Sequence, residues 1–563
     1  MKKFLLSLLA LMVPFLNIAQ DAQDTIAPEA VGLDQKIDQV FGNATGWFVD
    51  FIFYQIPFTD DIRIYWVLFP LILGAGFFTI YFKGINFTGI WTAIKVVRGK
   101  YEDIEKYGAS TLYGEEGIAA GVDMNKVDDL DKHLTENKDE IVIDGDIADT
   151  IRDESSDGEV SHFQALTAAL SATVGLGNIA GVAIAVSIGG AGATFWMIVA
   201  GLLGMASKFV ECTLGVKYRD VGPDGTIFGG PMYYLTKGLK NKPLGKILAG
   251  AFAVMCIGGS FGGGNMFQVN QAVQLFENMT GGTESFLYGY RWVFGIIMAV
   301  LVGIVIIGGI KSIAKVTDKI VPFMVVIYVA ASLFVLIAKY DMIGAAFGEI
   351  IDGAFAPIGI VGGAVGVLIQ GFRRAAFSNE AGVGSASIAH AAVRTKYPAS
   401  EGLVALLEPF IDTVVVCTMT ALVLIITGNV DPGNAGLNDA DAILLTSGAF
   451  ESVISWFPYV LTVAVVLFAF STQISWSYYG YQSWAYLFGR TKRTEYTYKI
   501  IFCLFVIVGA SASLSSVIGF SDAMIFGMMV PNMIGIVLLA PKVKGELKKY
   551  MDAIKMKRKA VTD

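Results

Sequence analysis

Long apolar runs separated by short polar segments make up most of this chain. A helix needs about 20 apolar residues to cross the hydrocarbon core of a bilayer. Runs of roughly that length predict helical spans at residues 62–82, 163–188, 192–216, 247–276, 292–310, 316–338, 354–372, 402–427, 455–485, 498–518 and 520–540. The pattern therefore predicts an all-α polytopic membrane protein.

Glycines interrupt two of these spans. In the span at 163–188, Gly175 and Gly177 weaken the helix directly after Ser171 and Thr173. Broken backbone is tolerated at membrane depth only beside protein or a water-filled cavity, where its carbonyls and amides can bind ions and solutes. A second glycine-rich stretch covers 359–371. Interrupted helices at matching places in two halves, 163–338 and 339–540, are typical of a five-plus-five inverted repeat, here preceded by one extra helix at 62–82.

Polar side chains inside the spans are the candidate chemistry. Asn178 and Gln268 are costly in lipid unless they find a partner, so we expect them to bind a solute, with helix packing as the alternative. Ser471 and Thr472 precede Trp476 on one span, and oxygen ligands without a carboxylate suit a monovalent cation such as sodium. These hydroxyls can instead bond to their own helix.

The composition agrees with a membrane protein. Of the 563 residues, 54% are hydrophobic and only 16% are charged, and the mean hydropathy is +0.60. A soluble domain of this length would carry more charge. Most of the 41 Lys and Arg residues fall in segments predicted to face the cytoplasm, and none of these segments is basic enough to indicate a nucleic-acid partner.

The N-terminus predicts the orientation. Residues 1–20 combine two lysines, an apolar core and a small-residue end, which is typical of a cleavable secretory signal peptide, with an uncleaved anchor as the alternative. Its removal would leave 21–61 as an extracytoplasmic segment. A cytoplasmic loop at 83–162 and a basic cytoplasmic tail at 541–563 would follow. We therefore expect a multi-pass protein of a bacterial-type inner (plasma) membrane.

The remaining features indicate no enzyme and no cofactor. The acidic stretch at 115–159 is typical of a solvated insertion, with a partner-binding segment as the alternative. The four cysteines, Cys212, Cys256, Cys417 and Cys503, show no CxxC spacing. His133, His162 and His390 fall in predicted inner segments, where we expect solvated side chains. No GxSxG, HExxH or Walker-type motif is present.

Several longer motifs then resemble one family in the right order. They are Ser161-His162-Phe163-Gln164-Ala165-Leu166, residues 171–181, Gly229-Gly230-Pro231-Met232-Tyr233-Tyr234, residues 264–270 and Phe377-Ser378-Asn379-Glu380-Ala381-Gly382-Val383-Gly384-Ser385-Ala386. Together they resemble the alanine or glycine:cation symporter family over roughly residues 60 to 540, the acidic insertion excepted. Leu176 stands where that family commonly has Thr, and Ala375-Ala376 stand where Gly-Leu is usual.

The resemblance implies a LeuT-type fold and sodium-coupled uptake of a small neutral amino acid, alanine or glycine. It implies a substrate site of Thr173, Gly175, Gly177, Asn178, Gln268, Gly362, Gly363, Gly366, Thr472 and Trp476. It implies a sodium site of Ser171, Val174, Phe468, Ser471 and Thr472. Sodium would be a cotransported ion rather than a bound cofactor.

Two alternatives stay open. The coupling ion could be a proton carried by Glu408 or Asp412, although two carboxylates four residues apart are also typical of a helix-end pair near the cytoplasmic interface. The chain could also be a channel, or a transporter-like receptor that binds the amino acid without moving it. The preference between glycine, L-alanine and D-alanine, and the oligomeric state, do not follow from the sequence.

Overall fold

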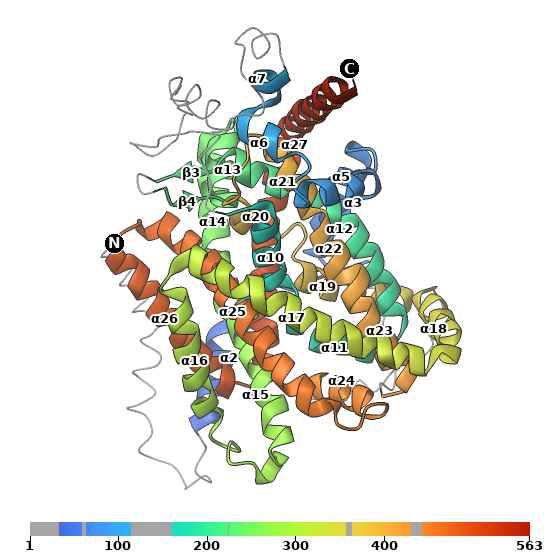
Figure 1. Cartoon of the computed structure of the whole chain (residues 1–563). Coiled ribbons are helices and arrows are strands. Elements are labelled where there is room, and N and C mark those ends of the chain that lie inside the picture. Colours follow the sequence, from blue (N-terminus) through green and yellow to red (C-terminus); the bar gives the residue numbers. More distant parts are fainter. Residues whose placement is uncertain are drawn as a thin grey trace.

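A bundle of long helices forms the core of the protein, as a computed structural model shows (Figure 1). The structure describes residues 33–58, 63–113, 160–222, 225–355, 363–429 and 442–562. The predicted signal peptide at 1–20 and the acidic stretch at 115–159 lie outside these residues. Long, uniformly apolar segments form helices because a helix satisfies its own backbone polar groups in lipid.

The N-terminal part contains one apolar helix and several short ones. Its elements are α2 (Leu33–Ile52), β1 (Gln55–Pro57), β2 (Arg63–Tyr65), α3 (Leu68–Tyr81), α4 (Ile85–Thr88), α5 (Ile90–Val97), α6 (Glu102–Tyr107) and α7 (Ala109–Tyr113). Strands β1 and β2 pair antiparallel, with Ile56 opposite Ile64. The expected extra span at 62–82 is thus a 14-residue helix, α3, which packs against α12 and α27.

The next part of the chain begins with a broken helix. Its elements are α10 (His162–Thr173), the 3₁₀ turn η1 (Leu176–Asn178), α11 (Ala180–Gly189), α12 (Gly192–Lys217), β3 (Asp220–Val221), β4 (Ile227–Phe228), α13 (Pro231–Gly238), α14 (Lys242–Phe261), the π-helical η2 (Gly262–Met266), α15 (Phe267–Met279), η3 (Gly282–Glu284), α16 (Arg291–Ile306) and α17 (Gly309–Ala338). Helices α10 and α11 meet at 56°. The predicted interruption of the first core helix is therefore present.

The last part contains a second interrupted helix and three long ones. Its elements are η4 (Tyr340–Met342), α18 (Ile343–Phe355), α19 (Gly363–Asn379), α20 (Ala386–His390), α21 (Pro398–Ala405), α22 (Leu407–Pro409), the π-helical η5 (Phe410–Cys417), α23 (Thr418–Thr427), α24 (Ala442–Glu451), α25 (Phe457–Phe488), α26 (Lys492–Ser511) and α27 (Leu514–Thr562). Helix α27 continues through Pro531 and Pro541, so the basic C-terminal residues extend a membrane helix.

Among the described residues, seven helices are long and apolar enough to cross a membrane, and the bent pair α10 and α11 adds one more. Leu68–Tyr81, Arg291–Ile306 and Ala442–Glu451 are shorter apolar helices. The predicted spans coincide with helices except in the second half. There the span expected at 354–372 lies partly outside the described residues, since α18 is described as far as Phe355 and α19 from Gly363 onward.

The two ends of the bundle differ. Helices α6, α13 and α21 and the β3–β4 hairpin lie at the end from which the C-terminus emerges, whereas α18 and α24 lie toward the opposite half (Figure 1). Helix α12 packs against α19 and α21, and α14 packs against α25 and α27. A parallel bridge between Val160 and Val393 ties the start of α10 to the chain that follows α20.

Candidate functional site

The break in the first core helix leaves backbone groups that a continuous helix would have satisfied. Helix α10 begins with a capping box formed by Ser161 and Gln164, and its last regular bond joins the amide of Val174 to the carbonyl of Leu170 at 2.7 Å. The amide of Gly175 would next bond to the carbonyl of Ser171. It donates instead to Oδ1 of Asn178, at 2.9 Å.

Two side-chain amides replace the missing helical bonds. Asn178 accepts from Gly175, and its Nδ2 donates to Asp412 Oδ1 at 2.6 Å. Gln268, on α15, accepts from the amide of Leu176 at 3.2 Å and donates to the carbonyl of Gly263 at 2.9 Å. Both side chains therefore lie at the break, as predicted, and in this conformation they hold protein groups.

Hydroxyl groups of α25 converge on the other side of the break. Thr472 Oγ1 donates to the carbonyl of Ser171 at 3.0 Å, and Ser171 Oγ donates to the carbonyl of Ser471 at 2.9 Å. Ser475 Oγ donates to Ser171 Oγ at 2.9 Å, and Ser471 Oγ donates to the carbonyl of Phe468 at 3.0 Å. The predicted sodium ligands on α10 and α25 thus form one cluster of oxygen atoms, and Ser471 Oγ also lies 3.7 Å from Met324 Sδ.

The remaining predicted residues differ in how closely they approach this cluster. Val174 is the buried C-cap of α10, adjacent to Gly175. A Cβ added at Gly175 would lie 2.6 Å from Thr472 Oγ1, so only glycine allows this approach. Gly177 faces the backbone of Ser378. Thr173 bonds to its own helix, at the carbonyl of Ala169 (3.3 Å), which favours a local role for its hydroxyl.

Trp476 links this cluster to a second break in the backbone. Its indole lies against Gly264, where an added Cβ would come within 2.2 Å of the ring. Its Nε1 donates to Glu380 Oε1 at 3.0 Å. Glu380, with a φ of 56°, begins the turn between α19 and α20, in which Gly382 and Gly384 have φ values of 82° and 98°.

The sequence predicted an interruption at 359–371 and did not predict this break at 380–384. Residues 363–379 form one continuous helix, and Gly366 lies about 20 Å from the end of that helix at ~1.5 Å per residue. Gly363 is its first residue, and Gly362 lies outside the described residues. Gly363 has a left-handed φ of 58°, whereas Gly366 and Gly371 lie inside α19. The break that contacts Trp476 has its left-handed φ values at 380–384.

The two carboxylates considered as proton carriers are not a solvated helix-end pair. Asp412, fully buried on η5, accepts from Asn178, from Ser378 Oγ at 2.8 Å and from Thr413 Oγ1 at 2.7 Å. Glu408 is fully buried and faces Lys208 Nζ at 3.0 Å. The expectation of solvated histidines is also wrong for His162 and His390, because both contact buried glutamates.

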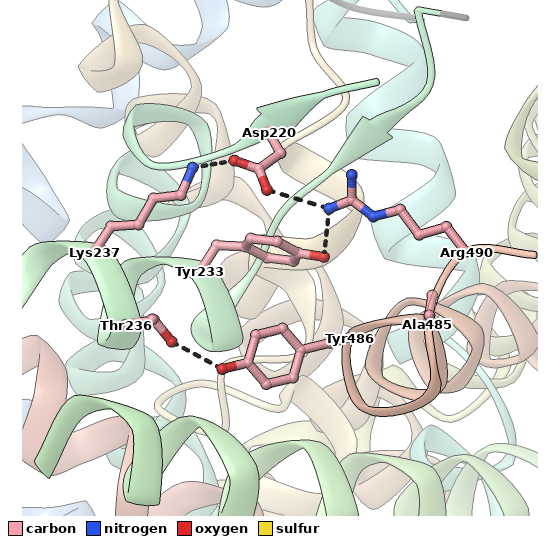
Figure 2. Close-up of a pocket in the computed structure, with 8 residues that line it drawn as sticks. Asp220, Tyr233, Thr236, Lys237, Ala485, Tyr486 and Arg490 are labelled. Carbon is pink, nitrogen blue, oxygen red and sulfur yellow. Dashed lines mark hydrogen bonds and ion pairs between the residues drawn. The ribbon is translucent and has the colours of Figure 1, made fainter. Parts of the chain in front are cut away.

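A pocket of about 390 Å³ lies at the end of the bundle that carries β3, β4 and α13. Figure 2 shows Asp220 between Lys237 and Arg490, with Arg490 also donating to the hydroxyl of Tyr233 at 3.1 Å. Burial raises the pKa of Tyr233 to about 12, so its hydroxyl stays protonated at neutral pH. The opposed charges cross-link α13 to the end of α25.

Comparisons with known proteins identify the family of this chain. The model of the sodium:alanine symporter family matches residues 144–563. The sodium/alanine symporter AgcS of Methanococcus maripaludis is 43% identical over 72% of this chain and 88% of its own length. The probable sodium/glutamine symporter GlnT of Bacillus subtilis is 35% identical over 70% of this chain and 79% of its own length.

A solved structure shares the fold. The crystal structure of MhsT in complex with L-phenylalanine, a LeuT-fold transporter, is similar with a TM-score of 0.50 at 14% identity, covering 70% of this chain and 99% of its own. At this identity the likeness shows the fold alone. The helices are interrupted where cotransporters bind their solutes, and sequence similarity extends across all of them. We conclude that this chain belongs to the sodium:alanine symporter family, whose members carry amino acids together with a cation.

Proposed function

We propose that this protein moves alanine or glycine into the cell together with sodium, and that the two bind on either side of the first helix break. The observation that carries the proposal is the oxygen cluster between α10 and α25. Its members are the carbonyl and hydroxyl of Ser171, the carbonyl and hydroxyl of Ser471 and the hydroxyls of Thr472 and Ser475. Neutral oxygens without a carboxylate suit a hard monovalent ion.

The amino acid would bind at the amides after the break. The amides of Gly175 and Leu176 are free of helical bonds and lie where a half-helix begins, so the local dipole favours a carboxylate. In the proposed bound state the substrate carboxylate replaces Gln268 Oε1 at Leu176. The tight approach of Gly175 to Thr472 supports a small side chain.

Ion and amino acid would favour each other because both stabilise the same broken segment. At a potential of ~100 mV and a tenfold gradient, one inward sodium supplies roughly 3.7 kcal/mol. That energy supports accumulation by several hundredfold. The predicted orientation, with the C-terminus and most basic residues inside, makes this direction inward.

Sodium-dependent uptake by purified, reconstituted protein tests the proposal. We expect labelled alanine or glycine to accumulate with sodium outside and to stop accumulating when choline replaces sodium, at every pH from 6 to 8. Thr472→Val should lower uptake at least tenfold and raise the sodium concentration needed for half-maximal rate. The reason is that this change removes an oxygen of the cluster but keeps the side-chain shape.

Thr462→Val is the matched control. Thr462 is also on α25, but its hydroxyl bonds to its own helix at the carbonyl of Pro458 (2.8 Å). Uptake by this variant should equal that of the wild type. Accumulation in choline would contradict sodium coupling. Binding of alanine without counterflow of labelled alanine would show a receptor instead of a transporter.

A further inference from the structure

A continuous chain of buried acidic and basic side chains runs inward from the start of α10. Glu105 faces His162 Nε2 at 2.7 Å, and Glu401 contacts His162 Nδ1 on the other side of the ring. Glu401 also contacts His390 Nδ1, and His390 Nε2 contacts Glu408. Lys208 closes the chain on Glu408 at 3.0 Å. The side chains of Glu401, His390, Glu408 and Lys208 are completely buried, and that of His162 is 13% exposed.

The geometry fixes the number of protons in this chain. An ionised carboxylate only accepts hydrogen bonds, and a neutral imidazole donates from one nitrogen alone. Both nitrogens of His162 and both of His390 face carboxylates, so each ring can satisfy both partners only as imidazolium. Three carboxylates then balance two imidazolium ions and one ammonium. The net charge is zero, which is the state that a site without water favours.

Other titratable groups lie around this row of charged side chains, on the helices that pack against it. On α27, Tyr550 donates to Glu105; on α17, Asp318 accepts from Thr167 of α10 at 3.0 Å. Around His390, the groups on α12 and directly after it are Lys208, Glu211, Cys212 and Arg219. Cys212, His390 and Glu408 could offer three metal ligands, but both ring nitrogens of His390 are already engaged by carboxylates.

These contacts hold the N-terminal end of α10, which is one half of the broken first core helix. Helix α10 stops at Val174 and meets α11 at 56°, so its start can move independently of α11. The start of α10 is tied by His162 to α6 and α21, and by the backbone of Val160 to Ala392 and Arg394. Opening the bundle at this end by moving α10 must therefore separate His162 from both of its carboxylates.

We propose that this row of charged side chains is a proton-binding latch. It holds a proton on His162 while the cytoplasmic end of the bundle is closed. It releases that proton to the cytoplasm when α10 moves away. In the release step the imidazolium N–H bond breaks, the proton passes to water and the ring keeps the electron pair. The charged side chains return to zero net charge when the bundle closes and His162 takes up a proton from the same side. The inference rests on the transport function proposed above and adds the step that cytoplasmic pH controls.

Exchange of labelled alanine in inverted membrane vesicles tests the latch. The bath then faces the end from which the C-terminus emerges, which cleavage of a C-terminal tag by added protease verifies. With sodium saturating on both sides and the lumen buffered at pH 7, the bath pH is varied from 6 to 9. Because opening releases one proton to the bath, the share of protein in the open state should rise about tenfold per pH unit, and we expect the wild-type exchange rate to rise with it before it levels off.

His162→Gln should exchange alanine at a rate that no longer depends on bath pH, since glutamine cannot titrate. His133→Gln makes the same substitution in the acidic stretch, outside the described residues, and as the matched control it should keep the wild-type profile. If His162→Gln does not fold, Glu105→Gln serves instead, because loss of one acceptor should move the profile to lower pH by about one unit or more.

A flat wild-type profile, or a wild-type profile in His162→Gln or Glu105→Gln, would overturn the latch. Absence of sodium-dependent exchange at every pH would instead overturn the transport function. The two failures are therefore distinguishable in one experiment.

Discussion

At the scale of single residues, side chains at the first break do the work of missing backbone bonds. Asn178 and Gln268 accept hydrogen bonds from the amides of Gly175 and Leu176, and Thr472 donates to the carbonyl of Ser171. Each replacement bond can be exchanged for a bond to an ion or a substrate at low cost, because one partner substitutes for another of similar strength. A continuous helix could not make that exchange.

Gly175 is the residue where this arrangement leaves the least room. Gly175→Ala would place a Cβ 2.6 Å from Thr472 Oγ1 and 3.2 Å from Gln268 Oε1. We expect alanine uptake to fall at least tenfold, because the hydroxyl must move away from the oxygen cluster. Gly250→Ala on α14 is the control, since an added Cβ there meets nothing within 4 Å. Its uptake should be unchanged, and its thermal stability equal or slightly higher. Equal uptake by both variants would contradict a close approach at Gly175.

At the scale of elements, irregular helix marks the site. The π-helical segments η2 and η5 each lie beside a break, since Gly263 of η2 accepts from Gln268 and Asp412 of η5 accepts from Asn178. Single π-helical segments within α-helices are frequent at functional sites, because they turn side chains and free carbonyls toward a cavity. The second break, at residues 380–385, supplies Glu380 to the indole of Trp476.

The position of that second break can be tested with two glycines. Gly384 has a φ of 98°, and an added Cβ would lie 2.8 Å from Pro231 Cγ. Gly384→Ala should therefore destabilise the protein by about 1–3 kcal/mol and lower the Tm in detergent. Gly366→Ala, within the continuous helix α19, should leave both Tm and uptake close to wild type. The reverse ranking would return the break to the glycine-rich stretch.

At the scale of the whole molecule, buried charges join separate helices. Arg373 and Arg374 of α19 both pair with Asp522 of α27, in addition to the latch between α6, α10 and α21. Both arginines follow the span predicted at 354–372, and in the structure they are helix residues. Arg373 also lies over the ring of Phe53, 4.4 Å from its centroid. Such contacts tie elements that hydrophobic packing alone would leave free to slide.

Removal of the shared carboxylate should be costly. Asp522→Asn leaves Arg374 buried beside a neutral partner, and we expect a loss of about 3 kcal/mol in unfolding free energy. The control is Asp552→Asn, which removes an exposed pair with Lys555 on the same helix and should change stability by about 0.5 kcal/mol or less. Thermal unfolding of both variants in one detergent measures the difference. Equal Tm values would show that the buried pair carries no net stability.

The class of protein and the first break were both predictable from the amino-acid sequence. Apolar length defines spans because lipid offers no hydrogen bonds, and Gly175 and Gly177 in such a span signal unwound backbone. Asn178, Gln268 and the α25 hydroxyls were recognisable because polar groups are costly at that depth. These are local properties, and each can be read from a short window.

Which distant residues contact each other became known from the folded structure. It placed a break at 380–385 that was not predicted from the sequence, because the left-handed φ values there depend on what the backbone must avoid. It also joined Glu105, His162, Glu401, His390 and Glu408, which are widely separated in sequence, into one chain. Taken one at a time, these side chains are of the types usually found in solvated loops or at helix ends. Their pairing is a property of helices that pack together, and pairing is what makes a buried charge tolerable.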